Sequence, residues 1–441
     1  MFDTIKNALK SKEIKKKLWY TLLLLVIFRM GCFITIPMVN IQTLDDTMKQ
    51  YSNGITGLIN TVSGGAFSRL SIFAMSITPY ITASIIVQLL AMIIPSLERL
   101  TKEGGEEGRK KVDRITKLIS LTLALIEALG VYFAYKNSGI FIQTGWLTAV
   151  IVVCSLVAGT SLLMWLGDKI TTKGVGNGIS MIIFAGIVSG IPSALTNIFG
   201  LVKQDGVFST KGLVTAILMI VGIMVLVVGI VFVQLAERRI PVQYSKKVVG
   251  RKMMGAQNTH IPIKPAMASV MPIIFASSFM TFPAMVIELF VKDIENRSGF
   301  LRVLYNLSIA TSSSSVGWQY TIINAIIYLL LIVGFTYFYT YATFNPAEVA
   351  NTIKQNGGFI PGIRAGKPTA DYLSSVLSKV VLFGGLFLAA IAIIPMFAKA
   401  SGLNTAFGGS SILIVVGVAI ELSQQLQSLV VMKHYKGFLK N

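Results

Sequence analysis

Apolar runs of about 20 residues recur along the whole chain, and each could cross a ~30 Å hydrocarbon layer as one helix. A segment in lipid has to satisfy its backbone polar groups internally, and these runs lack the two-residue alternation of a transmembrane barrel. The sequence therefore predicts an all-α polytopic membrane protein with ten transmembrane helices. The predicted spans are 18–36, 72–94, 118–135, 147–166, 179–198, 212–235, 267–290, 319–340, 373–396 and 409–432.

The composition excludes an ordinary soluble enzyme. Hydrophobic residues make up 54% of the 441 residues and charged residues only 13%, whereas a soluble domain carries about a quarter. The formal net charge of +20 would suggest nucleic-acid binding in a soluble chain, but here the basic residues lie in loops between apolar runs. With a cytoplasmic amino terminus, 28 Lys and Arg fall on the cytoplasmic side and nine on the other. The positive-inside rule thus predicts that both termini are cytoplasmic.

The ten spans divide into two sets of five. Because five is odd, two related halves would be inverted relative to each other, as in proteins with a path at the repeat interface. The amino-terminal segment is either an interfacial amphipathic helix or a disordered basic topology signal. The long cytoplasmic loops of the second half are 236–266 and 341–370. The expected order is N-terminal segment, first half, hinge region, second half and cytoplasmic tail, over 1–17, 18–198, 199–211, 212–432 and 433–441.

Residues suited to catalysis are scarce. The two histidines, His260 and His434, lie in basic cytoplasmic segments, which excludes a Ser-His dyad or a histidine proton relay inside the membrane. The P-loop, HExxH and GxSxG patterns are missing, and both Cys32 and Cys154 lie in apolar runs, where a thiol usually packs as a small hydrophobe. We therefore expect no enzymatic activity, no metal site and no cofactor.

A few ionisable residues fall inside the apolar runs, where charge is costly and functional by default. Glu127, in the middle of the third run, is the clearest candidate, with a carboxyl paired to a neighbouring helix as the alternative. For Arg29 and Glu421 an interhelical pair is the favoured interpretation. So few charges suit an ion-coupled secondary transporter poorly, and that is the main competing class for a chain with two five-helix halves.

Eight stretches of distinctive sequence extend from span 2 to span 10. They are TVSGGAFSRLSIFAMSITPYITASIIVQLL at 61–90, LTKEGGEEGRKKVDRITK at 100–117, WLGDKITTKGVGNGISMIIFAGIVSGIPSA at 165–194, ERRIPVQY at 237–244, GAQNTHIPIK at 255–264, PIIFASS at 272–278, FNPAEVANTIKQNGGFIPGIR at 344–364 and FGGSSILIVVGVAIE at 407–421. In these stretches the chain resembles the SecY/Sec61-alpha family, the pore-forming subunits of the Sec protein translocon. The resemblance runs from about Phe28 to the carboxyl terminus. Two departures, Ala365 where a proline is common and IPMVN at 36–40 where Pro-Gly is more usual, bear on docking details and not on the pore.

The resemblance implies a clamshell of two inverted halves around an hourglass pore. The pore would be plugged on the outer side and able to open sideways into lipid between spans 2 and 7. Its constriction is a ring of apolar side chains, and a narrow apolar ring dewets and so resists the passage of ions. For any single residue of the ring, ordinary helix packing is the alternative interpretation. The matching positions are Ile77, Ile81, Ile179, Ile183, Ile274 and Ile414.

The plug of the family corresponds to the stretch from Gly54 to Ser68, which is too short and too polar to span a membrane. After Ser63, the paired glycines Gly64 and Gly65 would provide its hinge. A plain external loop is the alternative.

The lateral gate of the family corresponds to a polar seam between spans 2, 3 and 7. Polar side chains in such a seam would hydrogen-bond one another when the gate is closed, at roughly 1 kcal/mol per pair, so that a hydrophobic signal sequence could open it. The matching residues are Gln88, Glu127, Ser277 and Ser278.

The cytoplasmic loops resemble the docking surfaces for the ribosome and for the SecA motor ATPase. Arg251 and Lys252 match a basic pair associated with ribosome contact, and Arg364 matches an arginine associated with the motor. Clustered basic residues suit ribosomal RNA phosphate, although the same charges could serve only to enforce topology. The other implied partners are the small membrane subunits SecE and SecG, signal sequences, unfolded polypeptides and the lipid bilayer.

The function implied is a passive, gated protein-conducting channel. It would translocate unfolded secretory proteins across the bacterial cytoplasmic membrane, with a plastid membrane as the alternative location, and release transmembrane segments sideways into the lipid bilayer. Energy would come from the partners, because the sequence shows no nucleotide site.

Overall fold

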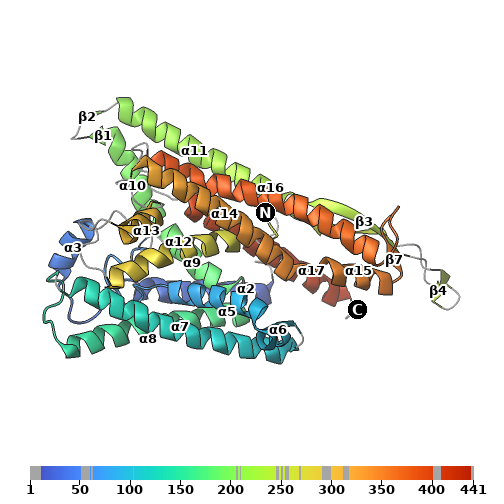
Figure 1. Ribbon diagram of the computed structural model, residues 1–441, viewed down its shortest axis with the longest axis horizontal. Coiled ribbons are helices and arrows are strands. Elements are labelled where there is room, and N and C mark those ends of the chain that lie inside the picture. The colour runs from blue at the N-terminus through green and yellow to red at the C-terminus, as the bar shows by residue number, and fades with distance from the viewer. Residues whose placement is uncertain are drawn as a thin grey trace.

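A computed structural model of the chain consists mainly of long helices (Figure 1). It describes residues 11–50, 60, 63–102, 104–136, 138–204, 207–208, 210–244, 248–249, 252–253, 258–267, 270–290, 299–310, 317–400 and 409–438. The elements up to the middle of the chain are α2 (Lys12–Gly31), α3 (Ile41–Gln50), α5 (Thr78–Ile93), α6 (Pro95–Lys102), α7 (Gly105–Tyr135), α8 (Trp146–Lys173), α9 (Gly178–Ser189), α10 (Ile191–Val202), β1 (Lys203–Gln204) and β2 (Val207–Phe208). The later elements are α11 (Thr210–Leu235), β3 (Arg238–Tyr244), β4 (Val248–Val249), β5 (Lys252–Met253), β6 (Asn258–Ile263), α12 (Met271–Phe290), α13 (Phe300–Ile309), α14 (Trp318–Thr343), α15 (Pro346–Gln355), β7 (Gly358–Phe359), α16 (Lys367–Ala400) and α17 (Gly409–Phe438).

Each of the ten predicted spans coincides with a helix or a pair of helices. By length and composition, seven spans among the described residues could cross a membrane, or eight if α5 and α6, which meet at an angle of 108°, form one broken span. The two remaining predicted spans coincide with α2, whose first turns are rich in lysine, and with α12, which is apolar over Met271–Ala284. The prediction of an all-α polytopic membrane protein is therefore confirmed.

Two spans differ from the hydropathy pattern because turn-forming residues interrupt them. The run 72–94 begins as a series of turns, with Ser76 at a φ of 52°, and becomes helical only at Thr78, where Pro79 fits the first helical turn. The run 179–198 is divided into α9 and α10 at Gly190, and α10 begins with Ile191-Pro192. At the amino terminus, residues 12–17 form the start of α2, while residues 1–10 lie outside the described part of the chain.

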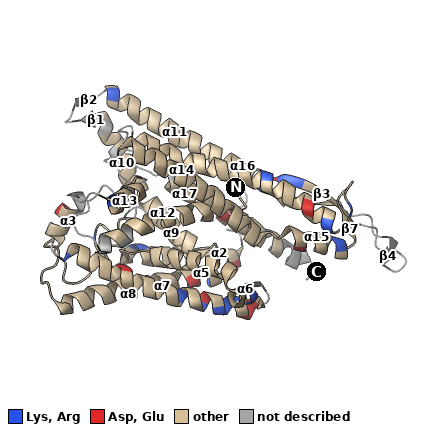
Figure 2. Cartoon of the chain, in the orientation of Figure 1, with Lys and Arg blue, Asp and Glu red and all other residues tan. Residues whose placement is uncertain are grey.

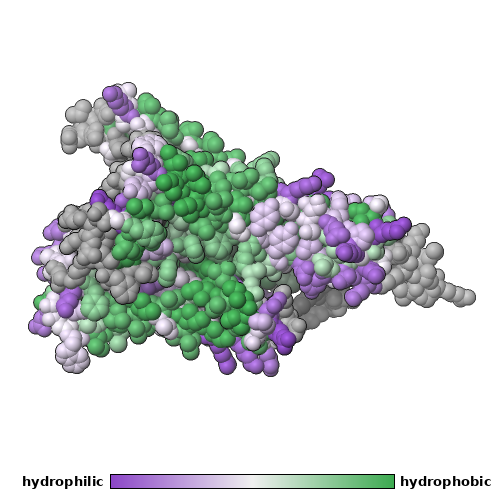
Figure 3. Space-filling view, in the orientation of Figure 1, coloured by the Kyte–Doolittle hydropathy of each residue, from purple (hydrophilic) through white to green (hydrophobic). Residues whose placement is uncertain are grey.

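The surface has the distribution expected of a protein that spans a membrane. A band of apolar side chains crosses the middle of the molecule, and hydrophilic residues lie at its two ends (Figure 3). On α11, for example, Met224 is 63% exposed and Phe232 is 77% exposed, and a large apolar surface of this kind is typical of contact with lipid. Lys and Arg gather at the end that carries α6, β3 and α15 (Figure 2).

Helices α2 and α5–α10 form one bundle, and α11–α17 form a second one beside it (Figure 1). The two bundles meet along two seams. At one seam α12 packs against α5 and α7, and at the other α17 packs against α9 while α10 packs against α11. The chain itself joins the bundles only at the second seam, between α10 and α11. This arrangement leaves the α5–α7–α12 seam held by side-chain packing alone.

A three-stranded antiparallel sheet extends one end of the second bundle. Its strand order is β6-β3-β7, with Ile240 opposite Ile261 and Gln243 opposite Phe359. The sheet packs on α15 and α16 through a cluster that includes the fully buried Leu373 and Leu377. A rigid base therefore supports the basic end of the molecule.

Candidate functional site

Six isoleucines from both bundles come together in one hydrophobic cluster at the centre of the molecule. Ile77 is the N-cap of α5 and Ile81 lies in the first turns of that helix. Ile179 and Ile183 lie one turn apart on α9, Ile274 lies on α12 and Ile414 on α17. Five of them are at most 8% exposed, and Ile179 is partly buried against the others. We call this set the isoleucine cluster. The residues predicted to form the ring are thus brought together, although they are spread over more than 300 residues of sequence.

The positions of α5 and α9 follow from local hydrogen bonds and close packing. The amides of Tyr80 and Ile81 both donate to the carbonyl of Ile77, at 3.0 and 3.1 Å, which closes the first turn of α5. At α9 the side chain of Asn177 accepts from the amide of Ile179 at 3.1 Å and so caps the helix.

Helix α9 lies directly against the backbone of α8. A Cβ added to Gly178 would lie 1.9 Å from the carbonyl oxygen of Gly167, so any side chain there would push the helices apart. Since α9 is fixed against α8 at its first residue, Ile179 and Ile183 face the centre in a defined register.

The described part of the predicted plug is a compact turn against the isoleucine cluster. Gly64 and Gly65 have φ values of 65° and 85°, as a glycine-dependent turn requires. The hydroxyl of Ser63 accepts from the amide of Phe67 at 3.2 Å, and the hydroxyl of Ser68 donates to the carbonyl of Gly65 at 3.0 Å. Ala66, between them, is fully buried in the same cluster as the isoleucines. Gly54 and residues 55–59, 61 and 62 of the predicted plug lie outside the described residues.

Three side chains from neighbouring helices hold this turn by its backbone carbonyls. Arg29, near the end of α2, donates from Nη1 to the carbonyl oxygen of Gly64 at 2.5 Å, and the hydroxyl of Ser189 reaches the same oxygen at 3.5 Å. The thiol of Cys32 lies 3.9 Å from the carbonyl of Ser63.

The guanidinium of Arg29 has a second contact, with an aromatic ring. It lies 5.1 Å from the centroid of the Phe33 ring, and the guanidinium of Arg69 lies 4.2 Å from the same centroid. Sequence reasoning expected an interhelical pair for Arg29 and so missed its partner, because that partner is a backbone carbonyl.

The predicted lateral gate lies at the seam where α12 packs against α5 and α7. Two of its polar side chains, Gln88 and Ser277, form hydrogen bonds within their own helices and not across the seam. Gln88 donates to the hydroxyl of Ser84 at 3.2 Å, and Ser277 donates to the carbonyl of Ile274 at 2.9 Å. Among the described residues, no hydrogen bond joins Gln88, Glu127 and Ser277. This conformation therefore lacks the hydrogen bonds predicted between the described side chains of Gln88, Glu127 and Ser277.

Glu127 and Ser278, also predicted for the gate, have distinct environments. Glu127 is only 8% exposed within α7, and Ser278 is half-buried on α12, where its carbonyl accepts from the hydroxyl of Thr281 at 3.2 Å. Apolar packing joins the two sides instead: Ile85 of α5 and Phe275 of α12 are both buried in the central cluster.

The predicted docking residues lie toward the basic end of the molecule. Arg364 is exposed in the turn between β7 and α16, and its carbonyl accepts from the hydroxyl of Thr369 at 2.8 Å. Gly366 has a φ of 105°, which a glycine adopts readily. This chain therefore keeps the glycine of the family's Pro-Gly pattern, while Ala365 stands in the place of the proline. Arg251 and the side chain of Lys252 lie outside the described residues.

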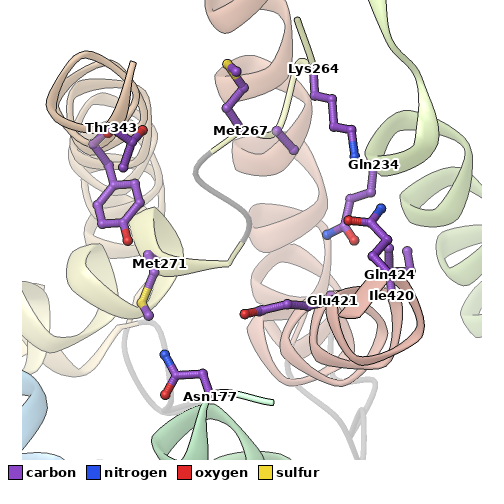
Figure 4. A pocket seen from close by; sticks show the side chains of 12 residues that line it. Asn177, Gln234, Lys264, Met267, Met271, Thr343, Ile420, Glu421 and Gln424 are labelled. Carbon is purple, nitrogen blue, oxygen red and sulfur yellow. Dashed lines mark hydrogen bonds between the residues drawn. The ribbon is translucent and has the colours of Figure 1, made fainter. Parts of the chain in front are cut away.

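A polar cavity of about 370 Å³ lies between the isoleucine cluster and the sheet (Figure 4). Its walls come from the N-cap of α9, the end of α11, the residues after β6, the first residue of α12, the last turns of α14, and α17. The polar side chains that line it include Asn177, Gln234, Lys264, Glu421 and Gln424. Sequence reasoning expected an interhelical pair for Glu421, but among the described residues its carboxylate forms no ion pair.

Comparisons with known proteins agree with this geometry. The chain is 42% identical to the protein translocase subunit SecY of Halalkalibacterium halodurans and 40% identical to that of Bacillus subtilis, over the full length of each chain. A solved structure described as a protein conducting channel superposes with a TM-score of 0.67 at 21% identity, covering 93% of this chain and 91% of that one. Sec61 in the canine ribosome–channel complex superposes with a TM-score of 0.61 at 20% identity, covering the same shares. The SecY family model matches residues 71–423, and the chain belongs to this family.

Proposed function

We propose that the chain is the protein-conducting channel of a translocon and that unfolded polypeptides pass through the isoleucine cluster. The observation that carries this proposal is the convergence of six isoleucines from four helices of both bundles in one buried cluster. The described turn at residues 63–68 packs directly against that cluster. An apolar constriction of this kind excludes water and ions when it is closed, and it adapts to side chains of different size when a chain passes.

The α5–α7–α12 seam is the proposed exit for hydrophobic segments. Gln88 and Ser277 are bonded within their own helices, and among the described residues no hydrogen bond joins the residues predicted for the gate, so opening the seam breaks none between them. Opening the seam removes apolar contacts between α12 and its neighbours α5 and α7. A hydrophobic segment that enters the seam can replace those contacts with its own. Transmembrane segments would leave by this route into the lipid bilayer.

The partners are proposed from the family and from the charge distribution. Ribosome-bound Sec61 and Ssh1 channels share the fold of this chain, and the basic loops 236–266 and 341–370 suit contact with ribosomal RNA through Arg251 and Lys252. The SecA motor would dock at Arg364, while SecE and SecG would complete the membrane complex. The basic end of the molecule would face the cytoplasm, with both termini on that side of the bacterial cytoplasmic membrane.

Site-specific photo-crosslinking tests the channel directly. We would replace Ile183 with a photoreactive residue, reconstitute the chain with its small partner subunits, and stall a secretory polypeptide during transport. We expect crosslinks to the polypeptide at this position. The matched control is the same replacement at Met224, which is 63% exposed on the outer face of α11 and should crosslink to lipid only. Equal crosslinking at both positions, or none at Ile183 while the polypeptide is transported, would refute the proposed path.

A further inference from the structure

The carboxylate of Glu421 faces the polar cavity next to the isoleucine cluster. Glu421 follows Ile414 by seven residues on α17, which is two helical turns, so both side chains lie on nearly the same face of the helix. The rise over seven residues places Glu421 ~10 Å along the axis from the isoleucine cluster, toward the end that carries the sheet. A polypeptide that approaches the cluster from that end must pass this carboxylate.

The charge of Glu421 has no partner among the described residues. Figure 4 shows its side chain extending into the cavity toward Asn177 and Met271, while Lys264 lies on the other side, near Gln234 and Gln424. Lys264 forms no ion pair with Glu421, although both line the cavity. The carboxylate is exposed to the cavity, so an incoming group can reach it.

The cavity also contains an unused hydrogen-bond donor. Gln234 is only 7% exposed, and its Nε2 has no partner. The backbone of Gly417 passes close to this side chain, since a Cβ added to Gly417 would lie 3.3 Å from Nε2. Asn177 is likewise fixed, because its Oδ1 caps α9. The cavity therefore offers one free carboxylate, which can accept from a cationic side chain, in a space of about 370 Å³.

We propose that Glu421 binds the cationic residues that precede the apolar core of a signal sequence and so holds the start of an incoming polypeptide beside the isoleucine cluster. This inference rests on the proposed function and adds the chemistry of the segment that this part of the channel recognises. Signal sequences carry Lys or Arg just before an apolar core of ~7–15 residues. Lys264, on the opposite wall, repels a second cation and confines the bound one to the side of Glu421.

The dimensions agree with this proposal. A helical apolar core of about ten residues is ~15 Å long, so a core centred on the isoleucine cluster begins ~7–8 Å from it. The preceding basic residue then lies at about the height of Glu421, ~10 Å from the cluster, and a lysine or arginine side chain easily spans the difference. The apolar core would occupy the α5–α12 seam at the level of Ile81 and Ile274.

A peptide-binding cycle tests the proposal on the full chain reconstituted with its small partner subunits. The probes are two synthetic signal peptides with the same apolar core, one beginning with three lysines and the other with three glutamines. The two proteins are the wild type and Glu421→Gln. Because the carboxylate is open to water, we expect Glu421→Gln to weaken binding of the lysine peptide by about three- to tenfold and to leave the glutamine peptide unchanged. Raising the salt concentration should reduce the difference between the peptides in the wild type only.

The control and a reciprocal variant make the outcome decisive. Glu107→Gln removes an exposed carboxylate from the first turn of α7, outside the cavity, and should affect neither peptide. Glu421→Lys should reverse the preference in favour of a peptide that begins with three glutamates. Equal effects of Glu421→Gln on the lysine and glutamine peptides would overturn the proposal.

Crosslinks from the apolar core to Ile81 separate this proposal from the channel itself. If the core crosslinks there but the lysine preference does not depend on Glu421, the recognition site is refuted and the channel stands. If neither peptide reaches Ile81, the channel and the recognition site both fail.

Discussion

Replacing Arg29 with methionine should loosen the turn that packs on the isoleucine cluster and increase ion leakage through the closed channel. Methionine keeps most of the length of the side chain and removes the guanidinium. The change deletes the hydrogen bond from Nη1 to the carbonyl of Gly64 and the contact of the guanidinium with the Phe33 ring. The apolar packing of Ala66 in the central cluster is not touched.

The magnitude follows from these two contacts. A hydrogen bond from a charged donor contributes about 1.5–3 kcal/mol, and an exposed cation–π contact about 0.5–1 kcal/mol. Arg69 stays over the same ring and Ser189 still reaches the Gly64 carbonyl, so part of the loss is compensated. A net loss of about 2 kcal/mol would raise the population of the displaced turn by about 30-fold. A minor state of about 0.1% would become about 3%.

Single-channel recording in planar bilayers measures this population as open time in the absence of substrate. Arg302→Met, on the exposed face of α13, removes the same charge without touching the turn and serves as the control. Arg29→Lys keeps the charge but loses the planar guanidinium, so we expect an intermediate leak. If the open time of Arg29→Met equals that of Arg302→Met, Arg29 does not hold the turn.

Three further changes test other parts of the site. Gly64→Ala should increase ion leakage more than Gly65→Ala, because both positions have positive φ but only at Gly64 would the new Cβ lie 2.7 Å from Ser189 Oγ and 2.9 Å from the backbone of Gly186; equal conductance of the two variants would contradict this. Glu127→Leu replaces a carboxyl that is only 8% exposed and should stabilise apolar packing at the α12 seam by about 1 kcal/mol, so that a signal sequence must be more hydrophobic to open it. A transport assay with signals of graded hydrophobicity measures this threshold, and an unchanged threshold would contradict the prediction. Arg364→Glu should slow transport driven by the motor ATPase about tenfold or more while signal-peptide binding stays normal, and unchanged transport kinetics would exclude Arg364 from docking.

Hydropathy and charge were sufficient to locate the helices but not to predict their contacts. The ten apolar runs all contain helices because lipid forces backbone hydrogen bonds to close within a segment. Whether Ile183 meets Ile414 depends on how two bundles pack, and a single sequence contains no record of that packing. The six positions could be named only from resemblance to a family, since an isoleucine in an apolar helix does not by itself indicate a place in a pore.

The errors of prediction have specific physical causes. The start of α5 was placed too early because a hydropathy window does not register that Pro79 fits only the first turn of a helix. The partner of Arg29 was missed because it is the main-chain oxygen of Gly64, 35 residues away, and any residue type provides such an oxygen. Hydrogen bonds across the gate were expected from the resemblance to the family, but Gln88 and Ser277 bond to Ser84 and to the carbonyl of Ile274 on their own helices.

The choice of isoleucine for the central cluster has a mechanical consequence. A β-branched side chain on a helix has one strongly preferred χ1 rotamer, so it cannot swing aside as leucine or methionine can. The proposed constriction at Ile81, Ile183, Ile274 and Ile414 would therefore widen by separation of the backbones of α5, α9, α12 and α17. Since α5 and α12 also form the seam proposed as the exit into lipid, one displacement of these helices would widen the aperture across the membrane and open the slit into the bilayer.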